Sequence, residues 1–137
     1  MSSRNRAVQL DLGGYAKGYA LDRAAALLKG MGVNNALINI GGNVMALGDK
    51  GGTPWRVGIQ HPRASTPLAT LELKDGEAIG TSGDYQRYFE LGGRRYSHLI
   101  DPRTVEPAAG TQALIVLIPP RSDGKAGLWS DVASKPL

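Results

Sequence analysis

Short segments that favour strands occupy most of this chain, and only one long segment has the apolar spacing of a helix. In that segment, apolar residues recur at helical spacing from Ala16 to Met31, and glycines stand near its end. Another apolar helical pattern begins over residues 128–133, close to the end of the given sequence. The strand-like runs cover residues 7–12, 36–40, 43–47, 55–60, 68–73, 77–81, 85–91, 94–100 and 113–118. This pattern predicts an α+β fold with a largely antiparallel sheet, one main N-terminal helix and a truncated C-terminal helix.

Glycine-containing dipeptides separate several of these runs. Asp75-Gly76 and Gly92-Gly93 each stand between two strand-like runs, and such dipeptides accept the positive φ angles of tight turns. We therefore expect a hairpin at each of them. Gly41-Gly42 is likewise expected to form a turn between two strands.

Length and composition are those of an ordinary globular chain. With 137 residues, of which 42% are hydrophobic and 20% charged, one domain spanning residues 1–137 is expected. No segment approaches the ~18 consecutive apolar residues of a membrane span, and no signal peptide is visible. The chain has no cysteine, which excludes disulfides and thiol chemistry. Its net charge of +4 favours an anionic ligand, but the basic residues are scattered, so we expect no nucleic-acid partner.

The greatest concentration of reactive side chains lies in residues 97–104, Ser-His-Leu-Ile-Asp-Pro-Arg-Thr. His98 is one of only two histidines, and imidazole is the common side chain that titrates near neutral pH. A catalytic loop is one interpretation of this segment. In the other, His98 is an ordinary strand residue and Asp101 starts a turn before Pro102. The second histidine, His61, precedes a proline and is expected to be structural or on the surface.

Further polar segments admit both a binding role and a structural one. Residues 13–18, Gly-Gly-Tyr-Ala-Lys-Gly, would suit a phosphate, because N–H groups at a helix start and a lysine attract anions. Their spacing differs from known phosphate-loop and Rossmann signatures, so a glycine turn that allows close packing is the other interpretation. Residues 81–85, Thr-Ser-Gly-Asp-Tyr, would either offer hydroxyls to a ligand or stabilise their own turn. Ser130 and Asp131 would be helix caps in the simpler interpretation.

Taken in order, five segments extend over nearly the whole chain: residues 11–20 (DLGGYAKGYA), 39–43 (NIGGN), 54–59 (PWRVGI), 81–85 (TSGDY) and 98–104 (HLIDPRT). Together they resemble the motifs of the ApbE family, the FAD:protein FMN transferases. Their shared order is more specific than any one of them. The resemblance implies an ApbE-like fold, with FAD and Mg²⁺ as cofactors. It also implies transfer of FMN from FAD to a Thr or Ser of a target protein, with release of AMP.

The resemblance implies roles for individual residues as well. His98 would be the base that takes the proton of the attacking hydroxyl, while Asp101 and Thr104 would orient its loop. Oxygen atoms of Ala16 (its backbone carbonyl), Asp131 and Ser134 would hold the metal. The cofactor-binding residues would be Asp11, Lys17, Tyr19, Ser82, Asp84 and Ile100.

The resemblance further implies a flavin-accepting redox subunit as the partner protein. It places the full-length protein in the periplasm or on the membrane as an anchored lipoprotein.

The sequence departs from the family pattern in ways that affect this interpretation. Lys135 stands where the family usually has a Thr, and its ammonium would take the metal's electrostatic place beside the phosphates. Val105 stands where the family usually has Gly, which would stiffen that loop. The family's long N-terminal region is absent from the given sequence, so we expect a partial catalytic core. The alternative function is a flavin-binding or accessory protein of the same fold without transferase activity, and Lys135 favours it.

Overall fold

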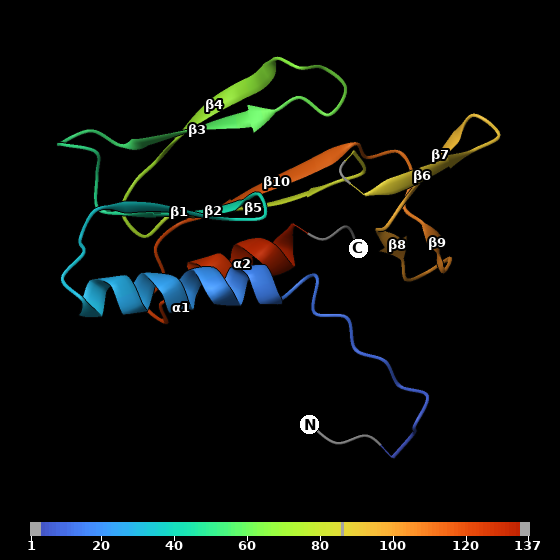
Figure 1. The fold of residues 1–137 in the computed structure, drawn as a ribbon, viewed down its shortest axis with the longest axis horizontal. Helices are drawn as coiled ribbons and strands as arrows, with labels where there is room; N and C mark the ends of the chain where they lie inside the picture. The colour runs from blue at the N-terminus through green and yellow to red at the C-terminus, as the bar shows by residue number, and fades with distance from the viewer. Residues whose placement is uncertain (1–3, 86, 135–137) are drawn as a thin grey trace.

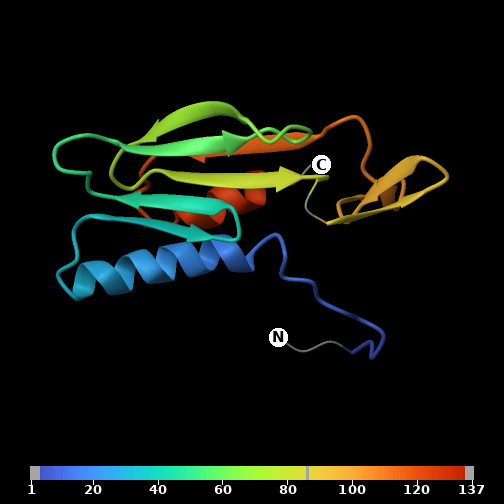
Figure 2. The same cartoon turned by 45° about the horizontal axis from the view of Figure 1, so that its top comes forward.

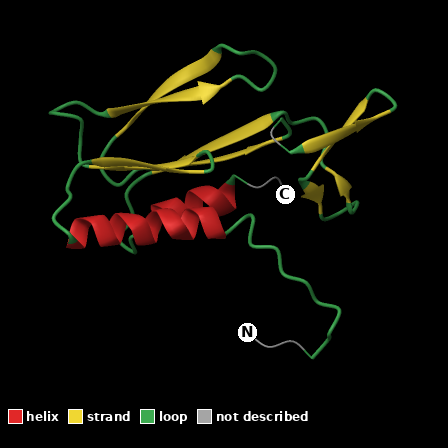
Figure 3. Ribbon diagram, viewed as in Figure 1, coloured by secondary structure: helices red, strands yellow, loops and turns green. Residues whose placement is uncertain are grey.

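Two helices and ten short strands form the structure, which is a computed structural model that describes residues 4–85 and 87–134. The helices are α1 (Ala16–Gly30) and α2 (Ala126–Ala133) (Figures 1 and 3). The strands are β1 (Ala36–Ile40), β2 (Asn43–Leu47), β3 (Trp55–Gln60), β4 (Pro67–Leu73), β5 (Ala78–Gly83), β6 (Tyr88–Leu91), β7 (Arg94–Ser97), β8 (Ile100–Asp101), β9 (Glu106–Pro107) and β10 (Ala113–Ile118).

The elements form three layers. A four-stranded antiparallel sheet in the order β1-β2-β5-β10 lies in the middle. Both helices cover one of its faces, and the two-stranded sheet β3-β4 covers the other (Figures 1 and 2). The β6-β7 hairpin and the β8-β9 pair project from one end of this body. The predicted α+β class with antiparallel sheets is confirmed.

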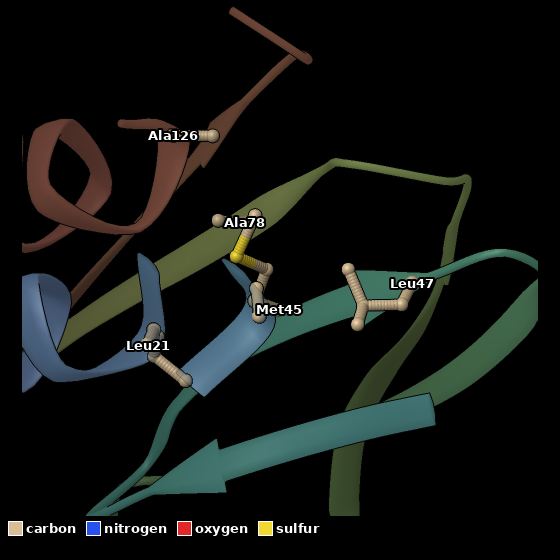
Figure 4. Close-up of a cluster of buried hydrophobic side chains, with 6 residues drawn as sticks. Leu21, Met45, Leu47, Ala78 and Ala126 are labelled. Atoms are coloured by element: carbon tan, nitrogen blue, oxygen red, sulfur yellow. The ribbon is translucent and has the colours of Figure 1, made fainter. Parts of the chain in front are cut away.

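Strand β2 is the centre of the core because it is buried on both faces. Its side chains alternate, so Met45 and Leu47 face the helices while Val44 and Ala46 face the β3-β4 sheet. Figure 4 shows the helix-side cluster, in which Met45 and Leu47 gather with side chains of α1, β5 and α2. A strand buried on both faces reads as a continuous apolar run, which is the pattern of residues 44–47.

Glycines allow α1 and α2 to pack at very short range. A Cβ on Gly18 would stand 2.8 Å from the Leu128 Cα and closer still to the Gly127 carbonyl oxygen. Each helix also caps the other. Asp22 of α1 accepts hydrogen bonds from the N–H groups of Gly127 and Leu128, at 2.8 and 2.9 Å. Asp131 of α2 accepts one from the Gly18 N–H at 3.0 Å. We call this close contact between α1 and α2, with its two capping carboxylates, the helix joint.

The strands predicted over residues 36–40, 43–47, 55–60 and 113–118 have those bounds in the structure. The turn at Gly41-Gly42 and the hairpin at Gly92-Gly93 are confirmed, and all four glycines have positive φ angles between 57° and 89°. The helix expected from Ala16 onward is α1.

The hairpin predicted at Asp75-Gly76 is wrong. The turn exists, but β4 before it pairs with β3, and β5 after it pairs with β2 and β10. The chain therefore passes from one sheet to the other at this turn. Gly76 donates to the Ala46 carbonyl at 2.9 Å, which ties the turn to β2.

The strand predicted over residues 7–12 is also wrong, because the structure has no ladder there. Val8, Leu10 and Leu12 do alternate with polar residues, but all three are more than half exposed. These residues run away from the body as an extended segment (Figure 1). An alternating run needs a partner strand and a face to cover, and the described residues supply neither.

Candidate functional site

A cavity of about 1080 Å³ opens between the middle sheet and β3. Its volume is that of a site for a large ligand. The inner wall is apolar and is made of Val44, Val57, Ile59, Ile79 and Ile115. The polar lining comes from the start of α1, the β1-β2 turn, the end of β5 and the loop after β7, including Lys17, Thr81, Ser82 and His98. The cavity thus offers an apolar slot with a polar mouth.

Lys17 supplies a cation to this mouth. Its Nζ lies 3.5 Å from the Gly41 carbonyl and 3.4 Å from Oδ1 of Asn43. Asn43 is fully buried, and the same Oδ1 accepts from the Thr81 N–H at 3.2 Å. Because both neighbours are donors, the amide must present its oxygen to them. Asn43 therefore fixes the ammonium of Lys17 relative to β5.

Three N–H groups at the start of α1 already have partners. Those of Tyr15 and Ala16 donate to the Leu12 carbonyl at 2.9 and 2.8 Å, and that of Gly18 donates to Asp131. An anion in the cavity would therefore be met by the Lys17 ammonium rather than by these groups. Gly18 serves the close helix packing that was one interpretation of this segment, while Gly13 and Gly14 line the cavity and their role beside a phosphate stays a prediction.

His98 lies on the other part of the polar lining, in the loop between β7 and β8. Its ring Nδ1 lies 3.1 Å from the Arg87 carbonyl oxygen, and its backbone N–H donates to the same oxygen at 3.3 Å. A carbonyl only accepts, so Nδ1 must carry the proton in the neutral ring. Nε2 is then the basic nitrogen. This is the tautomer in which a histidine takes a proton from a ligand through Nε2.

Asp101 and Thr104 shape the loop that follows. Asp101 forms a two-pronged ion pair with Arg103, at 2.9 and 2.6 Å, and this neighbour lowers the pKa of the carboxyl to about 2. The Thr104 hydroxyl accepts from the Glu106 N–H at 3.3 Å. These bonds stay within the β8-β9 turn, and Asp101 lines a smaller neighbouring cavity of about 150 Å³. Their predicted role in orienting the His98 loop stays a prediction.

The segment 81–85 contributes to the cavity unevenly. Ser82 lines it and is buried, with its Oγ 3.3 Å from Oγ of Ser134. Asp84 is not part of the lining. Its two carboxylate oxygens instead accept from Arg63 at 2.9 and 2.6 Å, and this bonding holds the pKa of Asp84 below its usual range.

The remaining predicted ligand residues occupy two different surroundings. Asp11 and Ile100 line the cavity, and the Asp11 carboxylate also accepts from the Gly13 N–H at 2.6 Å. Tyr19 does not line it. Its half-exposed ring stacks on Tyr15 with centroids 5.7 Å apart.

The predicted metal ligands lie close to the helix joint. Asp131 and Ser134 are fully buried, and the Ser134 hydroxyl donates to the Asp131 carbonyl at 2.9 Å. The bond from Gly18 brings the Asp131 carboxylate to the first turn of α1, which begins at Ala16. Lys135 lies outside the described residues.

These donors fit Mg²⁺ by their chemistry, since carboxylate, carbonyl and hydroxyl are the oxygen ligands that it prefers. Among the described residues there is no group of three or more His, Cys, Asp or Glu side chains that would hold a metal by itself. A magnesium ion here would therefore also take oxygen atoms from its ligand or from water.

Sequence reasoning missed several residues that organise the site. In the sequence, Asn43 belongs only to the segment NIGGN, Arg63 and Arg87 belong to no motif, and Asp22 is one polar residue of the predicted helix. Each acts through a contact with a residue at least 11 positions away in the chain. His61 accepts from the Arg63 N–H at 3.0 Å, which agrees with the structural role expected for it.

The fold and the cavity describe an α+β protein with a large binding site between two sheets, and comparison with known proteins gives it a family. The model of the ApbE family matches residues 1–134, so the chain belongs to the ApbE family. A protein from Rhodobacter capsulatus named FAD:protein FMN transferase is 50% identical over 135 residues, which are 98% of this chain and 25% of that protein. The resemblance found in the sequence motifs is confirmed.

Solved structures agree with the fold. The ApbE protein from Thermotoga maritima matches with a TM-score of 0.84 and 38% identity, covering 95% of this chain and 40% of that one. The flavinyl transferase ApbE from Pseudomonas stutzeri, in its apo form, matches with a TM-score of 0.72 and 40% identity, covering 93% and 38%. The chain spans two fifths or less of the length of these relatives.

Proposed function

We propose that the protein transfers FMN from FAD to a Thr or Ser hydroxyl of a target protein. The observation that carries this proposal is the cavity itself, which combines an apolar interior with a lysine and an imidazole in its polar lining. FAD has the same division, because its two ring systems are flat and largely apolar and its pyrophosphate is anionic. The names of the relatives support the same reaction.

The reaction replaces the phosphoanhydride bond between the FMN and AMP halves of FAD with a phosphoester bond to the target. The hydroxyl oxygen of the target attacks the phosphorus of the FMN half, the P–O bond of the pyrophosphate breaks, and AMP leaves with the bonding electron pair. The proton of the hydroxyl passes to Nε2 of His98. Negative charge builds up on the phosphate oxygens during this step, and the Lys17 ammonium would offset part of it.

His98 is suited to the role of base by its tautomer. The Arg87 carbonyl holds Nδ1–H, so Nε2 is the nitrogen that accepts a proton. A well-placed base of this kind contributes ~10²–10⁴ in rate. The ring is exposed, so a target protein has access to it.

Magnesium would be held by the Ala16 carbonyl, the Asp131 carboxylate and the Ser134 hydroxyl. When bound, it would offset negative charge on the pyrophosphate and so stabilise the leaving AMP. Asp131 also caps Gly18, which is compatible with this role because a carboxylate has two oxygens and about four lone pairs. Asp11, Tyr19, Ser82, Asp84 and Ile100 stay predicted contacts or neighbours of the flavin donor.

The partner would be a flavin-accepting redox subunit, and the location would be the periplasm or the membrane surface, by lipid anchoring. Within the described residues, neither helix has the length and apolar content to cross a bilayer.

Mass spectrometry of a candidate acceptor tests the proposal. The protein, expressed from its complete reading frame, is incubated with FAD, Mg²⁺ and a target that carries the acceptor threonine. The proposal expects a mass gain equal to one FMN less water, and none when that threonine is replaced by valine. FAD binding without any mass gain would overturn the proposal in favour of the flavin-binding function, which Lys135 favours in the sequence.

A further inference from the structure

The ion pair between Arg63 and Asp84 joins the two walls of the cavity. Arg63 lies in the connection after β3, whose residues 57–60 line one wall. Asp84 directly follows β5, whose residues 81–83 line the other. The guanidinium and the carboxylate meet through two parallel hydrogen bonds of 2.9 and 2.6 Å. Such a two-pronged pair fixes direction as well as distance.

The pair stands beside the cavity and does not line it. Both side chains are mostly covered, with 34% of Arg63 and 17% of Asp84 exposed. The two charges neutralise each other, and Arg63 also keeps the pKa of Asp84 low, so the carboxylate stays ionised. A neutral pair outside the lining is poorly suited to bind a phosphate directly. Its geometry suits it to hold the walls in place.

The segment after Asp84 leads directly to the partner of His98. Asp84 donates its backbone N–H to Gln112 at 3.1 Å, and three residues further on the Arg87 carbonyl holds the imidazole. Of the residues that the structure describes between β5 and β6, Asp84, Tyr85 and Arg87 lie outside the strands. The His98 N–H bonds the Arg87 end of this segment next to the β6-β7 pairing, and the Arg63 side chain is the anchor at its Asp84 end.

We propose that Arg63 is a positioning residue that, through Asp84, keeps the Arg87 carbonyl in place and so holds His98 in its Nδ1–H tautomer. We call this arrangement of Arg63, Asp84 and the Arg87 carbonyl the latch. Its contribution to the transfer reaction rests on the proposed function. The latch itself is independent of flavin, so its test needs no ligand.

The two histidines make the test direct. His98 has Nδ1–H facing the Arg87 carbonyl, whereas His61 accepts at Nδ1 from the Arg63 N–H and must carry its proton on Nε2. Proton–nitrogen NMR of imidazole-labelled protein distinguishes the two tautomers. The spectra are recorded at about pH 8.5, two units above the pKa of a free histidine side chain. His61 then serves as an internal reference, since its bond uses a backbone donor.

The expected result is loss of the single His98 tautomer in Arg63→Ala and in Asp84→Asn, with no further loss when the two are combined. The exchanged pair Arg63→Asp with Asp84→Arg should recover the wild-type signal, which a direct phosphate-binding role of Arg63 would not produce. Arg121→Ala is the matched control. It breaks a two-pronged pair with Asp123, two positions away, that joins no walls.

An unchanged His98 signal in folded Arg63→Ala and Asp84→Asn would overturn the latch. Should Arg63→Ala not fold, Asp84→Asn alone decides, because it keeps the size of the side chain and removes the charge. Where the wild type binds FAD, Arg63→Ala should weaken binding about fivefold, a typical upper effect of one ion pair. If the wild type binds no FAD, the proposed function is contradicted. The NMR experiment still tests the latch in that case, because it uses no FAD.

Discussion

The helix joint and the projecting strands β6 to β9 are held together in very different ways. In the joint, Gly18 and Gly127 bring two backbones into contact, and Asp22 and Asp131 cap the opposite helices. In the projecting part, each strand pairs only with its hairpin neighbour. Phe89 and Leu91 are 61% and 68% exposed there.

The predicted metal ligands lie at the joint, and the predicted base lies at the root of the projecting strands. The two parts of the site should therefore respond to mutation in opposite ways. Changes in the joint should unfold the protein. Changes around His98 should alter binding or transfer while the fold survives.

Gly18→Val should have the largest effect on stability. The new Cβ would lie 2.6 Å from Cβ of Asp131 and 2.8 Å from Cα of Leu128, and backbone atoms give way least. We expect a loss of about 3 kcal/mol or more in the free energy of unfolding, measured in urea. Gly30→Ala is the matched control, because a Cβ there meets nothing within 4 Å. It should be neutral or stabilise by up to about 1 kcal/mol. Equal effects of the two variants would contradict the packing of the joint.

Asn43→Ala should have the next largest effect. It removes the acceptor that Thr81 N–H and Lys17 share in the buried space between α1 and β5. A buried donor without its acceptor costs about 1–3 kcal/mol, which urea unfolding would record. FAD binding should weaken as well, because Lys17 loses its support. Unchanged stability would show that Asn43 does not carry this bond.

Acid should affect the two regions in opposite directions. The pKa of Asp101 is lowered to about 2 by Arg103, so its contribution to stability is present above the usual carboxyl pKa of 3.8 and is lost as pH falls toward about 2. Burial raises the pKa of Asp22, so this group takes up its proton above 3.8 and the folded state gains, relative to the unfolded state, as pH falls.

Amide NMR during an acid titration follows both groups. The Arg103 amide reports on Asp101 and should change well below pH 3.8, while the Leu128 amide reports on Asp22 and should change above it. If the two amide signals change with the same midpoint pH, Asp101 and Asp22 do not differ in their surroundings as described.

Val105→Gly should have the smallest effect and a stabilising sign. Val105 has a φ of 60°, a left-handed conformation that costs a β-branched residue about 1–2 kcal/mol. Glycine removes this strain but loses about 0.5–1 kcal/mol through its greater freedom in the unfolded chain. The melting temperature should therefore rise slightly. Val105→Ala keeps a Cβ and should show no comparable gain.

The sequence predicted those parts of the molecule that depend on local patterns. Strand β2 and the Gly92-Gly93 hairpin follow from apolar runs and from turn residues. The run at residues 7–12 has the same kind of pattern, but a strand also requires a partner, and periodicity says nothing about partners. The hairpin expected at Asp75-Gly76 was wrong for a related reason, because a tight turn does not determine which sheet the next strand joins.

In the candidate site, too, residues in local motifs were predictable and residues that act through distant contacts were not. His98, Lys17 and Ser82 were found from their motifs, and the structure places all three on one cavity. Asn43, Arg63 and Arg87 act through contacts with residues distant in the sequence, and Arg63 belongs to no motif that pointed to the site. Asp84 was expected beside the ligand. The structure shows its carboxylate paired with Arg63 beside the cavity, and its contact with the ligand stays a prediction.

In the proposed function, one side of the cavity binds FAD and the His98 side performs the transfer. The most direct test measures bound FAD and the FMN attached to the acceptor in the same samples of wild type, His98→Ala and Lys17→Ala. We expect His98→Ala to bind FAD as the wild type does and to transfer ~10²–10⁴ times more slowly. Lys17→Ala should lose affinity for FAD. Undiminished transfer by His98→Ala, with FAD bound, would refute the role of His98 as the base.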